Sequence, residues 1–398
     1  MRLPCREEEL KVALIHDWLT GMRGGERVIE VFCELYPEAD LFTLVHVKNR
    51  VSGTIEKMKI QTSFVQRFPK VSEYYRYYLP FFPLAIERFD LRGYDLIISS
   101  SHCVAKGILP MPGALHISYC HTPMRYVWDV HLEYFQDTGK GLKNFLISAI
   151  ANYLRIWDVT SSQRVDEFIA NSRFVQQRIK RYYRRESTVI HPPVKCDYFR
   201  PLTRLKGEGS RDGDYFLMVT AFAPYKRVDL AIEAFNRLGK PLLIVGDGQG
   251  VNDLKKRAKK NIEFLGWQND EKLREIYQDC KAFVFPGKED FGITPVEAQA
   301  CGKPVIAYGE GGVRETVQPF PHEKPTGVFF DQPTAESLIQ AVHVFERNRE
   351  RFNPGEIRNH AVLFDQGIFR EKIRSFVKEK VEAFCSSSGR GDRFAEKI

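Results

Sequence analysis

Short apolar runs alternate with helical patterns along the first half of the chain. The run KVALIHDW (11–18) predicts a buried strand, and a helix after GMRGGER is indicated by apolar residues at helical spacing: Val28, Val31, Phe32 and Leu35. Further strands are expected over 40–45, 95–101, 114–120, 167–171 and 187–191. Strands that alternate with helices indicate a parallel sheet covered by helices, so one α/β domain is complete by about residue 195.

The same pattern starts again after a segment without periodicity. Residues 192–216 contain prolines, glycines and charges, and we interpret them as an interdomain linker. A helix is then predicted over 227–238, and strands over 214–222, 241–248, 261–267, 281–287, 303–308 and 326–331. We therefore predict an N-terminal domain over 1–200 and a C-terminal domain over 201–368, with a ligand cleft between them. Residues 369–398 are expected to form a helix that packs back on the N-terminal domain, followed by a frayed tail.

Composition narrows the classes of protein only slightly. A length of 398 residues suits two domains, and the net charge of +8 is compatible with phosphate-bearing ligands, anionic lipid or nucleic acid. The eight cysteines are scattered without a Cys-x-x-Cys pair, so we expect reduced thiols in the cytoplasm and neither a zinc site nor a disulfide framework. The N-terminus lacks the apolar core of a signal peptide, and no run reaches the roughly 18 apolar residues of a spanning helix.

Candidate chemistry is concentrated in FPGKEDFGITPVEAQACGKPVIAYGEGG (285–312). A loop carries Glu289 beyond a buried strand, and a helix is predicted to begin at Thr294, the N-cap, with Pro295 in its first turn. The bare amides of this helix start, with Gly292 beside them, suit a diphosphate. Glu289 and Glu297 stand eight residues apart, so both can face one ligand. Two alternatives stay open: Thr294 and Glu297 also fit a capping box, and Glu289 fits a solvated loop acid.

These residues resemble the signature of glycosyltransferase family 4, retaining enzymes of the GT-B fold. The resemblance extends over about residues 11–375 and includes GMRGGERVIE, CHTPMRYVWD (120–129), EFIANSRFV, VIHPPV, VTAFAPYKRVDLAIEAF (219–235), VGDGQG and FLGW. It implies two Rossmann-like domains facing each other across a cleft. The motifs HTPMRYVWD and PYKRVDLAIEAF are similar to those of bacterial and archaeal mannosyltransferases that build surface polysaccharide on a lipid carrier.

The resemblance implies a role for residues of both domains. Glu297 would hold the ribose diol of the donor, Glu289 the transferred sugar, and Lys226 the diphosphate, without a metal. His121 would lie close to the sugar. The remaining implied donor-binding residues are Gly24 and Gly25 at the phosphates, Gly266 and Trp267 at the base, and Phe291, Gly292, Ile293 and Thr294 around the helix start.

Structural roles without a ligand also remain possible for these residues. Lys226 with Arg227 fits a solvated helix start, Gly24-Gly25 a simple turn, and His121 a structural histidine. Asn171 and Ser172 fit a helix cap. The sequence also departs from the family, which places an arginine where Ala221 stands, so a second phosphate cation has to come from elsewhere, with Arg227 and Arg173 as candidates.

In the GT-B fold the N-terminal domain usually binds the acceptor, and here this domain carries two unusual stretches. Residues 64–89 hold nine aromatic residues among Arg and Lys, and residues 173–186 hold six basic ones. Together they suit an anionic membrane surface or the diphosphate of an acceptor, although a buried core and a solvated charged face explain them equally. We therefore expect a cytoplasmic protein that can dock on the inner face of the plasma membrane.

The function expected from the resemblance is retaining transfer of a hexose, with mannose from GDP-mannose as the favoured donor. The acceptor would be a lipid-linked or glycan acceptor in surface polysaccharide biosynthesis. A UDP-sugar-dependent glucosyl or N-acetylglucosaminyl transferase is the next alternative, followed by a nucleotide-sugar epimerase and a non-catalytic sensor. Nucleic-acid binding is disfavoured because no nucleic-acid-binding motif accompanies the basic run.

Overall fold

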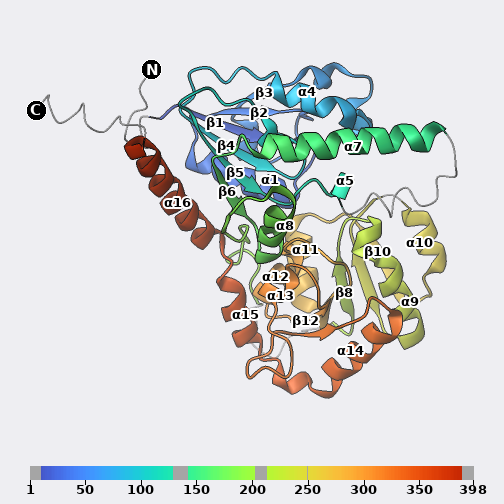
Figure 1. The fold of residues 1–398 in the computed structure, drawn as a ribbon. Coiled ribbons are helices and arrows are strands. Elements are labelled where there is room, and N and C mark those ends of the chain that lie inside the picture. Colours follow the sequence, from blue (N-terminus) through green and yellow to red (C-terminus); the bar gives the residue numbers. More distant parts are fainter. Residues whose placement is uncertain (1–9, 129–141, 202–212, 249, 388–398) are drawn as a thin grey trace, which may run out of the picture. The chain divides into compact units, whose positions relative to one another are not determined.

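The computed structural model describes residues 10–128, 142–201, 213–248 and 250–387, and the chain forms two compact units (Figure 1). The first unit contains the chain up to His191 and returns from Arg370 onward, and the second spans Pro192–Phe369. The end of the motif at Asp129, the segment 202–212, Gln249, Cys5 and the tail after 387 lie outside the described residues.

The first unit is built on a parallel sheet. Its strands lie in the order β3-β2-β1-β4-β5-β6-β7, with bounds β1 Val12–His16, β2 Asp40–Thr43, β3 Lys59–Thr62, β4 Leu96–Ser101, β5 Leu115–Cys120, β6 Glu167–Ala170 and β7 Thr188–Val189. The predicted strands are all present, and β3 is an addition. Its sequence KIQT lacks a buried run because it lies at the edge of the sheet with its side chains half-buried or exposed.

Helices of the first unit cover this sheet. They are α1 Gly24–Leu35, α2 Gly53–Glu56, α3 Val71–Tyr74, α4 Phe82–Glu87, α5 Arg125–Trp128, α7 Leu142–Ser162, α8 Arg173–Tyr183 and α16 Gln366–Ser387, with short 3₁₀ turns η2 Phe64–Arg67, η3 Tyr75–Phe81 and η4 Ala105–Gly107. The C-terminal helix α16 contacts this unit through two ion pairs, Arg370 with Glu34 at 2.5 Å and Lys380 with Glu167 at 3.5 Å. Within the described part of the chain, no helix has the length and apolarity to cross a membrane.

The second unit repeats the architecture. Its strands lie in the order β10-β9-β8-β11-β12-β13, with bounds β8 Phe216–Val219, β9 Leu242–Val245, β10 Ile262–Gly266, β11 Ala282–Phe285, β12 Val305–Tyr308 and β13 Gly327–Phe330. All their pairings are parallel. The helices are α9 Val228–Leu238, α10 Val251–Arg257, α11 Asp270–Asp279, α12 Ile293–Ala300, α13 Val313–Thr316, α14 Ala335–Arg347 and α15 Pro354–Val362, with turns η5 Pro224–Lys226 and η6 Arg349–Arg351.

Alternating residues of the central strands explain why helices cover both faces of this sheet. In β8, Phe216 and Met218 pack in one core with α9 and α14, while Leu217 packs in the other with α11 and α12. Because successive side chains of a strand point to opposite faces, an unbroken apolar run requires cover on both sides. The prediction of two Rossmann-like α/β domains is therefore confirmed.

The predicted linker is partly wrong. Val194, Cys196 and Phe199 are fully buried in the core of the second unit, and Val194 forms a bridge with Asp365. These three apolar residues are too few and too irregularly spaced to show a period, so composition alone assigned them to a connection. The division between units falls after His191 rather than at residue 200.

Candidate active site

The topology of the second unit brings Lys226 and Glu289 together. From β8 the chain moves outward through β9 and β10, then returns to place β11 on the other side of β8. Ligands of open parallel sheets bind at such a switch point, outside the carboxyl ends of the strands. Lys226 follows β8 in η5 and Glu289 follows β11, so both side chains lie at the switch point.

The two side chains form an ion pair in a partly enclosed position. Lys226 Nζ contacts Glu289 Oε2, and the side chains are only 15% and 17% exposed. The two loops approach closely because Gly287 has no side chain: a Cβ there would lie 2.8 Å from the Tyr225 carbonyl oxygen and 2.9 Å from the Lys226 Cα. A cation and a carboxylate are thereby held side by side, each able to contact a different part of one ligand.

A glycine pair fixes the backbone that carries Glu289. Gly312 N donates to the Glu289 carbonyl oxygen at 2.9 Å, and Gly311 forms a bridge with Glu289. A Cβ at Gly311 would lie 2.3 Å from the Glu289 carbonyl oxygen, and one at Gly312 would lie 2.3 Å from that of Asp290. These glycines were not predicted to have a role, although their position after a predicted strand, in YGEGG, is a usable signal.

Helix α12 begins earlier than the sequence predicts. Its N-cap is Gly292, with φ of 90°, and Thr294 lies inside the first turn, so the predicted Thr294 cap is wrong. A left-handed backbone conformation explains why glycine takes the cap position. The capping-box alternative for Glu297 fails with it, because Glu297 stands one turn inside the helix.

Glu297 is instead part of a buried polar pair. Its side chain is almost completely buried, and Oε2 accepts a hydrogen bond from the Tyr277 hydroxyl at 3.0 Å. Tyr277 is itself fully buried on α11, and it was not among the predicted residues. A buried carboxylate is costly unless it is hydrogen-bonded, and the Tyr277 hydroxyl supplies such a bond inside α12.

The other donor-binding candidates divide into surface and core residues. Ile293 and Thr294 are half-buried in the first turn of α12, whereas Phe291 is only 3% exposed and packs against Phe364. The Phe291 side chain is therefore a core residue, which its place in the motif did not reveal. Trp267 directly follows β10 and is 75% exposed, and Gly266 before it has φ of 69°.

Arg227 lies beside Lys226 in a left-handed conformation with φ of 53°. Its guanidinium pairs with Asp229 at 3.3 Å, and about a third of its side chain is exposed. Arg173, the other candidate for the cation missing at Ala221, begins helix α8 in the first unit. Of the two candidates, Arg227 therefore lies on the same element boundary as Lys226 but is paired with Asp229.

The switch point of the first unit lies between β1 and β4 and carries a second acid–base pair. Asp17 follows β1 and His102 follows β4, and His102 Nδ1 lies 3.0 Å from Asp17 Oδ2. Asp17 is fully buried and accepts four backbone N–H bonds of 2.6 to 3.0 Å from residues 102–105. This pair was not predicted, although polar residues directly after buried strands, in IHDW and SSSH, were a usable signal.

Burial and neighbouring charges together set the pKa values in this cluster. Burial opposes ionisation of Asp17, but the neighbouring His102 and its hydrogen bonds outweigh burial and hold the pKa of Asp17 well below its usual value. Burial raises the pKa of Glu26, in the first turn of α1, to about 7. It lowers the pKa of His16 to about 4, with the charge of His102 adding to the effect.

His121 lies in the same cluster, at the end of β5. Its Nε2 is 2.8 Å from the Ser100 hydroxyl, which is also 3.1 Å from His16 Nδ1. Burial, followed by the charges of His102 and His16, lowers the pKa of His121 well below its usual value. Gly25 packs here, since a Cβ would lie 3.3 Å from the His16 ring and 3.7 Å from His121 Nε2.

The alternative for Ser172 as a helix cap is confirmed. Its side chain accepts a hydrogen bond from Val175 N at 3.0 Å at the start of α8. Asn171 instead donates to the His121 carbonyl oxygen at 2.9 Å, which links this cap to the histidine cluster.

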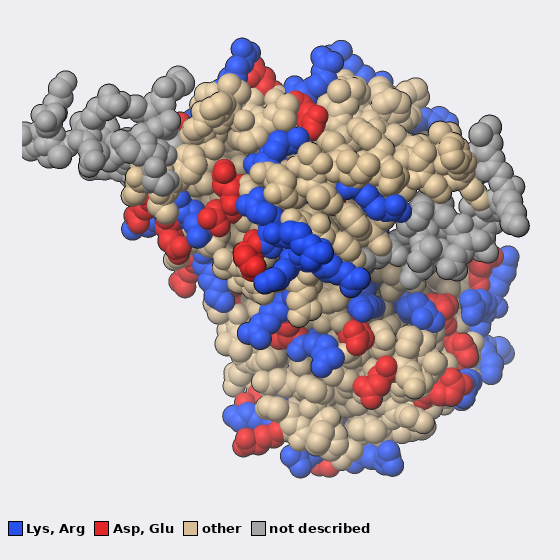
Figure 2. Space-filling view, viewed as in Figure 1, with Lys and Arg blue, Asp and Glu red and all other residues tan. Residues whose placement is uncertain are grey.

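The aromatic stretch 64–89 and the basic stretch 173–186 of the first unit divide between core and surface. Of the nine aromatic residues, Tyr74, Tyr77 and Phe81 are exposed, while the others are buried or packed against the core. Of the six basic residues, Arg178 stacks on Phe174 and Tyr182, and Arg185 donates to the Ser162 and Asp166 carbonyl oxygens. Figure 2 shows Lys and Arg gathered where α8 lies in Figure 1.

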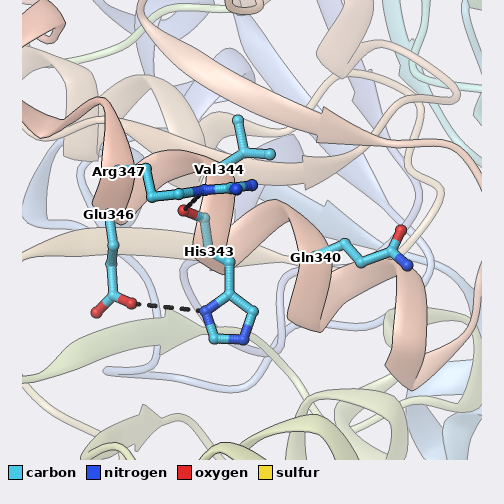
Figure 3. Close-up of a pocket in the computed structure, with 5 residues that line it drawn as sticks. All are labelled: Gln340, His343, Val344, Glu346 and Arg347. Atoms are coloured by element: carbon cyan, nitrogen blue, oxygen red, sulfur yellow. Dashed lines mark hydrogen bonds and ion pairs between the residues drawn. The ribbon is translucent and has the colours of Figure 1, made fainter.

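A separate pocket in the second unit lies on α14 (Figure 3) and is lined by Gln340, His343, Val344, Glu346 and Arg347. Its charged groups are already engaged: Lys240 contacts Glu346 at 2.8 Å, and Arg347 bonds the His343 carbonyl oxygen at 3.3 Å. None of the candidate site residues lines it, so it belongs to the helix surface rather than to the site.

Comparison with known families identifies the family of both units. The model described as Glycosyltransferase Family 4 matches residues 22–198, and the model described as Glycosyl transferases group 1 matches residues 203–358. The chain belongs to glycosyltransferase family 4. Each half of the chain thus matches a family domain, and the predicted family is confirmed.

Curated relatives cover only part of the family 4 chain. It is 31% identical over 157 residues to an uncharacterized glycosyltransferase of Methanocaldococcus jannaschii, an alignment that covers 38% of this chain and 42% of that protein. It is 29% identical over 147 residues to the O-antigen chain mannosyltransferase C of Escherichia coli, 35% of this chain and 39% of the other. The alignments therefore span about two fifths of each relative.

Solved structures agree with the fold over nearly the whole chain. Anabaena HepE in complex with UDP and glucose superposes with a TM-score of 0.66 at 16% identity, over 93% of this chain and 99% of that one. Sucrose-phosphate synthase from Thermosynechococcus elongatus gives 0.71 at 16% identity, over 94% and 100%. Likeness at this identity shows the fold, and the predicted GT-B class is confirmed.

Proposed function

We propose that this chain is a retaining glycosyltransferase that transfers a hexose, mannose from GDP-mannose, to a lipid-linked or glycan acceptor in surface polysaccharide biosynthesis. The observation that carries the proposal is the Lys226–Glu289 pair at the switch point of the second unit. A cation for a diphosphate and an acid for sugar hydroxyls stand together at the edge where ligands of such sheets bind.

In this mechanism the bond between the anomeric carbon and the diphosphate breaks while the acceptor oxygen attacks from the same face. The acceptor proton passes to the departing diphosphate, and Lys226 stabilises the negative charge that develops on it. Glu289 positions the sugar, and Glu297, oriented by Tyr277, accepts hydroxyl bonds from the ribose. No metal ion is assigned a role.

The donor is the least constrained part of the proposal. A mannosyltransferase among the relatives favours GDP-mannose, while HepE, solved with UDP and glucose, favours a UDP-sugar as the alternative. Trp267 offers an exposed ring on which either base can stack.

Thermal unfolding of the purified full chain in chelator tests the proposal. At a hundred times its dissociation constant, a ligand adds about 2.7 kcal/mol of stability. GDP-mannose and GDP should raise the melting temperature of the wild type and not that of the Lys226→Ala variant. Stabilisation by UDP-glucose alone would replace the donor, and no response to any nucleotide sugar would overturn the function. Epimerisation of a UDP-sugar without an acceptor would instead establish the epimerase alternative.

We further propose that the first unit docks on an anionic membrane surface through exposed apolar residues of α3, η3, α4 and α7. These are Tyr74, Tyr77, Phe81, Leu84, Phe145, Leu146, Tyr153 and Ile156, with exposed fractions of 45 to 75%. The elements are neighbours, since Trp157 of α7 donates to Glu87 of α4 at 2.9 Å. Aromatic residues with an exposed arginine, Arg76, suit the membrane interface.

Flotation with vesicles of anionic lipid at low salt tests this surface. The double variant Tyr77→Ser, Phe145→Ser should lose most of the binding. Leu363→Ser is the control, because Leu363 is also largely exposed, at 59% against 75% for Tyr77 and 73% for Phe145, but lies in the second unit. Equal binding by all three proteins, or no binding by the wild type, would contradict the docking proposal.

A further inference from the structure

The histidine cluster of the first unit contains one imidazole that is fixed on one side and open on the other. His102 Nδ1 is held by Asp17 at 3.0 Å, and the ring of Trp18 packs edge-on against it with centroids 4.4 Å apart. A quarter of the His102 side chain is exposed. Since Asp17 takes the Nδ1 hydrogen, Nε2 is the ring nitrogen left for a ligand, and no hydrogen bond joins it to another described residue.

The loop that carries His102 cannot easily move. Its four amides at 102–105 all donate to the Asp17 carboxylate, which is fully buried. Positioning of one imidazole nitrogen by a buried carboxylate is the arrangement used where the other nitrogen contacts a reacting or charged group. A purely structural role would therefore explain the position of Nδ1 but would leave Nε2 of His102 without a function.

The surroundings of His102 favour an anion. Burial alone would lower the pKa of His102, but the Asp17 charge and hydrogen bond outweigh it and raise that pKa, so the imidazolium persists closer to neutral pH. The Asp17 charge is already stabilised by its four amide donors, and Glu26, with a pKa of about 7, is partly protonated at neutral pH. The ionisable groups that act on His102 or lie in its cluster are His16, Asp17, Glu26, Arg76 and His121.

The start of α1 completes the setting. Gly24 and Gly25 open this 12-residue helix, and Gly25 packs against His16 and His121 of the same cluster. Amides at a helix start and two neighbouring arginines, Arg23 beside Glu26 and Arg76 beside His102, add positive potential.

We propose that His102 binds a phosphate group through Nε2, which makes the switch point of the first unit a phosphate site in addition to the Lys226 site. The inference rests on the proposed function for its biological ligand, the diphosphate of either the nucleotide-sugar donor or a lipid-linked acceptor. The chemistry is the same for both: an imidazolium N–H donates to a phosphate oxygen.

The test separates the two ring nitrogens. In His102→Asn, the side-chain amide replaces Nδ1 and keeps the bond to Asp17, while Nε2 is deleted; His102→Ala removes both. His343→Asn is the control, since His343 also faces a glutamate, Glu346 at 3.9 Å, but lies on α14 of the second unit. All are made in the full chain carrying Lys226→Ala, so that inorganic pyrophosphate reports on the first unit.

Calorimetric titration with pyrophosphate should show affinity reduced roughly 10- to 100-fold by His102→Asn, with the melting temperature kept and the His343→Asn control unchanged. The affinity of the parent should weaken as the pH rises above the ordinary histidine pKa and the imidazolium loses its proton, and this dependence should be smaller in the variant. Equal pyrophosphate affinity with and without His102 would overturn the proposal, as would a loss seen in His102→Ala alone.

Two further ligands, tested with Lys226 restored, identify the source of the phosphate. Weaker binding of farnesyl diphosphate with unchanged GDP affinity assigns His102 to the acceptor, and the reverse assigns it to the donor. Failure of the proposed function is distinguishable, because a chain that binds no nucleotide sugar can still bind pyrophosphate through His102.

Discussion

The two units place an acid and a base at the same topological position, yet the two pairs are built differently. In the first unit, Asp17 is completely buried and held by four amides as well as by His102. In the second, Lys226 and Glu289 hold each other and both remain partly exposed. The shared topology determines where polar groups collect, whereas burial determines whether a ligand can displace their contacts.

The difference separates a fixed pair from an exchangeable one. Removing Asp17 from its partners would leave a buried charge without hydrogen bonds, which costs several kcal/mol by order of magnitude. The Lys226–Glu289 contact has solvent beside it, so a diphosphate and a sugar hydroxyl can take its place at little cost. The first pair is suited to positioning and the second to chemistry.

The largest expected effect tests the exchangeable pair. Lys226→Ala should reduce kcat about 100- to 1000-fold, because it removes the cation that stabilises the departing diphosphate, a loss of roughly 3–4 kcal/mol in transition-state binding. Lys288→Ala is the control, since Lys288 pairs with Glu310 at 3.3 Å but is half exposed. Steady-state kinetics should leave the control within about twofold of the wild type. Equal losses in both variants would argue for a general charge effect.

A stability measurement tests the fixed pair through its neighbour Glu26. Its pKa is raised to about 7 from 4.5, so the folded state binds more protons than the unfolded state between these values and stability falls as pH rises. The free energy of unfolding of Glu26→Gln should therefore exceed that of the wild type by about 3 kcal/mol at about pH 8 and should equal it near pH 4. Urea unfolding at both pH values checks this, and an equal difference at both would refute the raised pKa.

The glycine pair Gly311 and Gly312, which fixes the Glu289 backbone, allows a smaller effect on the exchangeable pair to be measured. Gly312→Ala places a Cβ 2.3 Å from the Asp290 carbonyl oxygen, so the Glu289 loop must shift. We expect about 1–3 kcal/mol of lost stability together with lost activity, by analogy with overpacked positions. Gly53→Ala is the control, because nothing lies within 4 Å of its added Cβ. Activity that survives in the Gly312 variant would show that the loop tolerates displacement.

The smallest effect concerns Trp267, which is 75% exposed. Trp267→Ala should weaken nucleotide binding by about 1 kcal/mol, roughly fivefold, if a base stacks on the ring. Because the side chain is largely in solvent, the melting temperature without ligand should not change. Fluorescence titration with GDP and UDP measures the effect, and unchanged affinity for both would remove Trp267 from the site.

Periodicity predicted the sheets well because their strands are buried on both faces and are therefore continuous apolar runs. It failed where that condition does not hold. Edge strand β3 has no buried run, and Val194, Cys196 and Phe199 enter the core one at a time from an irregular segment. A local sequence pattern predicts burial only where a segment is regular. The burial of these segments depends on residues far away in the sequence.

The same distinction explains which candidate site residues could be predicted. Lys226, Glu289 and Glu297 lie in motifs that resemble the family, so they were identified without the structure. Tyr277 and His102 act through contacts with residues 20 and 85 positions away, and no local spacing encodes such contacts. The start of α12 was misplaced because Thr294 has cap chemistry, whereas the required left-handed backbone selects Gly292.

The four amide hydrogen bonds to Asp17 have a consequence for the order in which the first unit folds. Its amide donors stand 85 to 88 residues later in the chain, so β1 reaches the ribosome exit long before they exist. Until they arrive, the carboxylate is best left hydrated, which delays burial of the strand that precedes it. The first unit should accordingly fold in a late cooperative step that begins only after β4 and its loop have been synthesised.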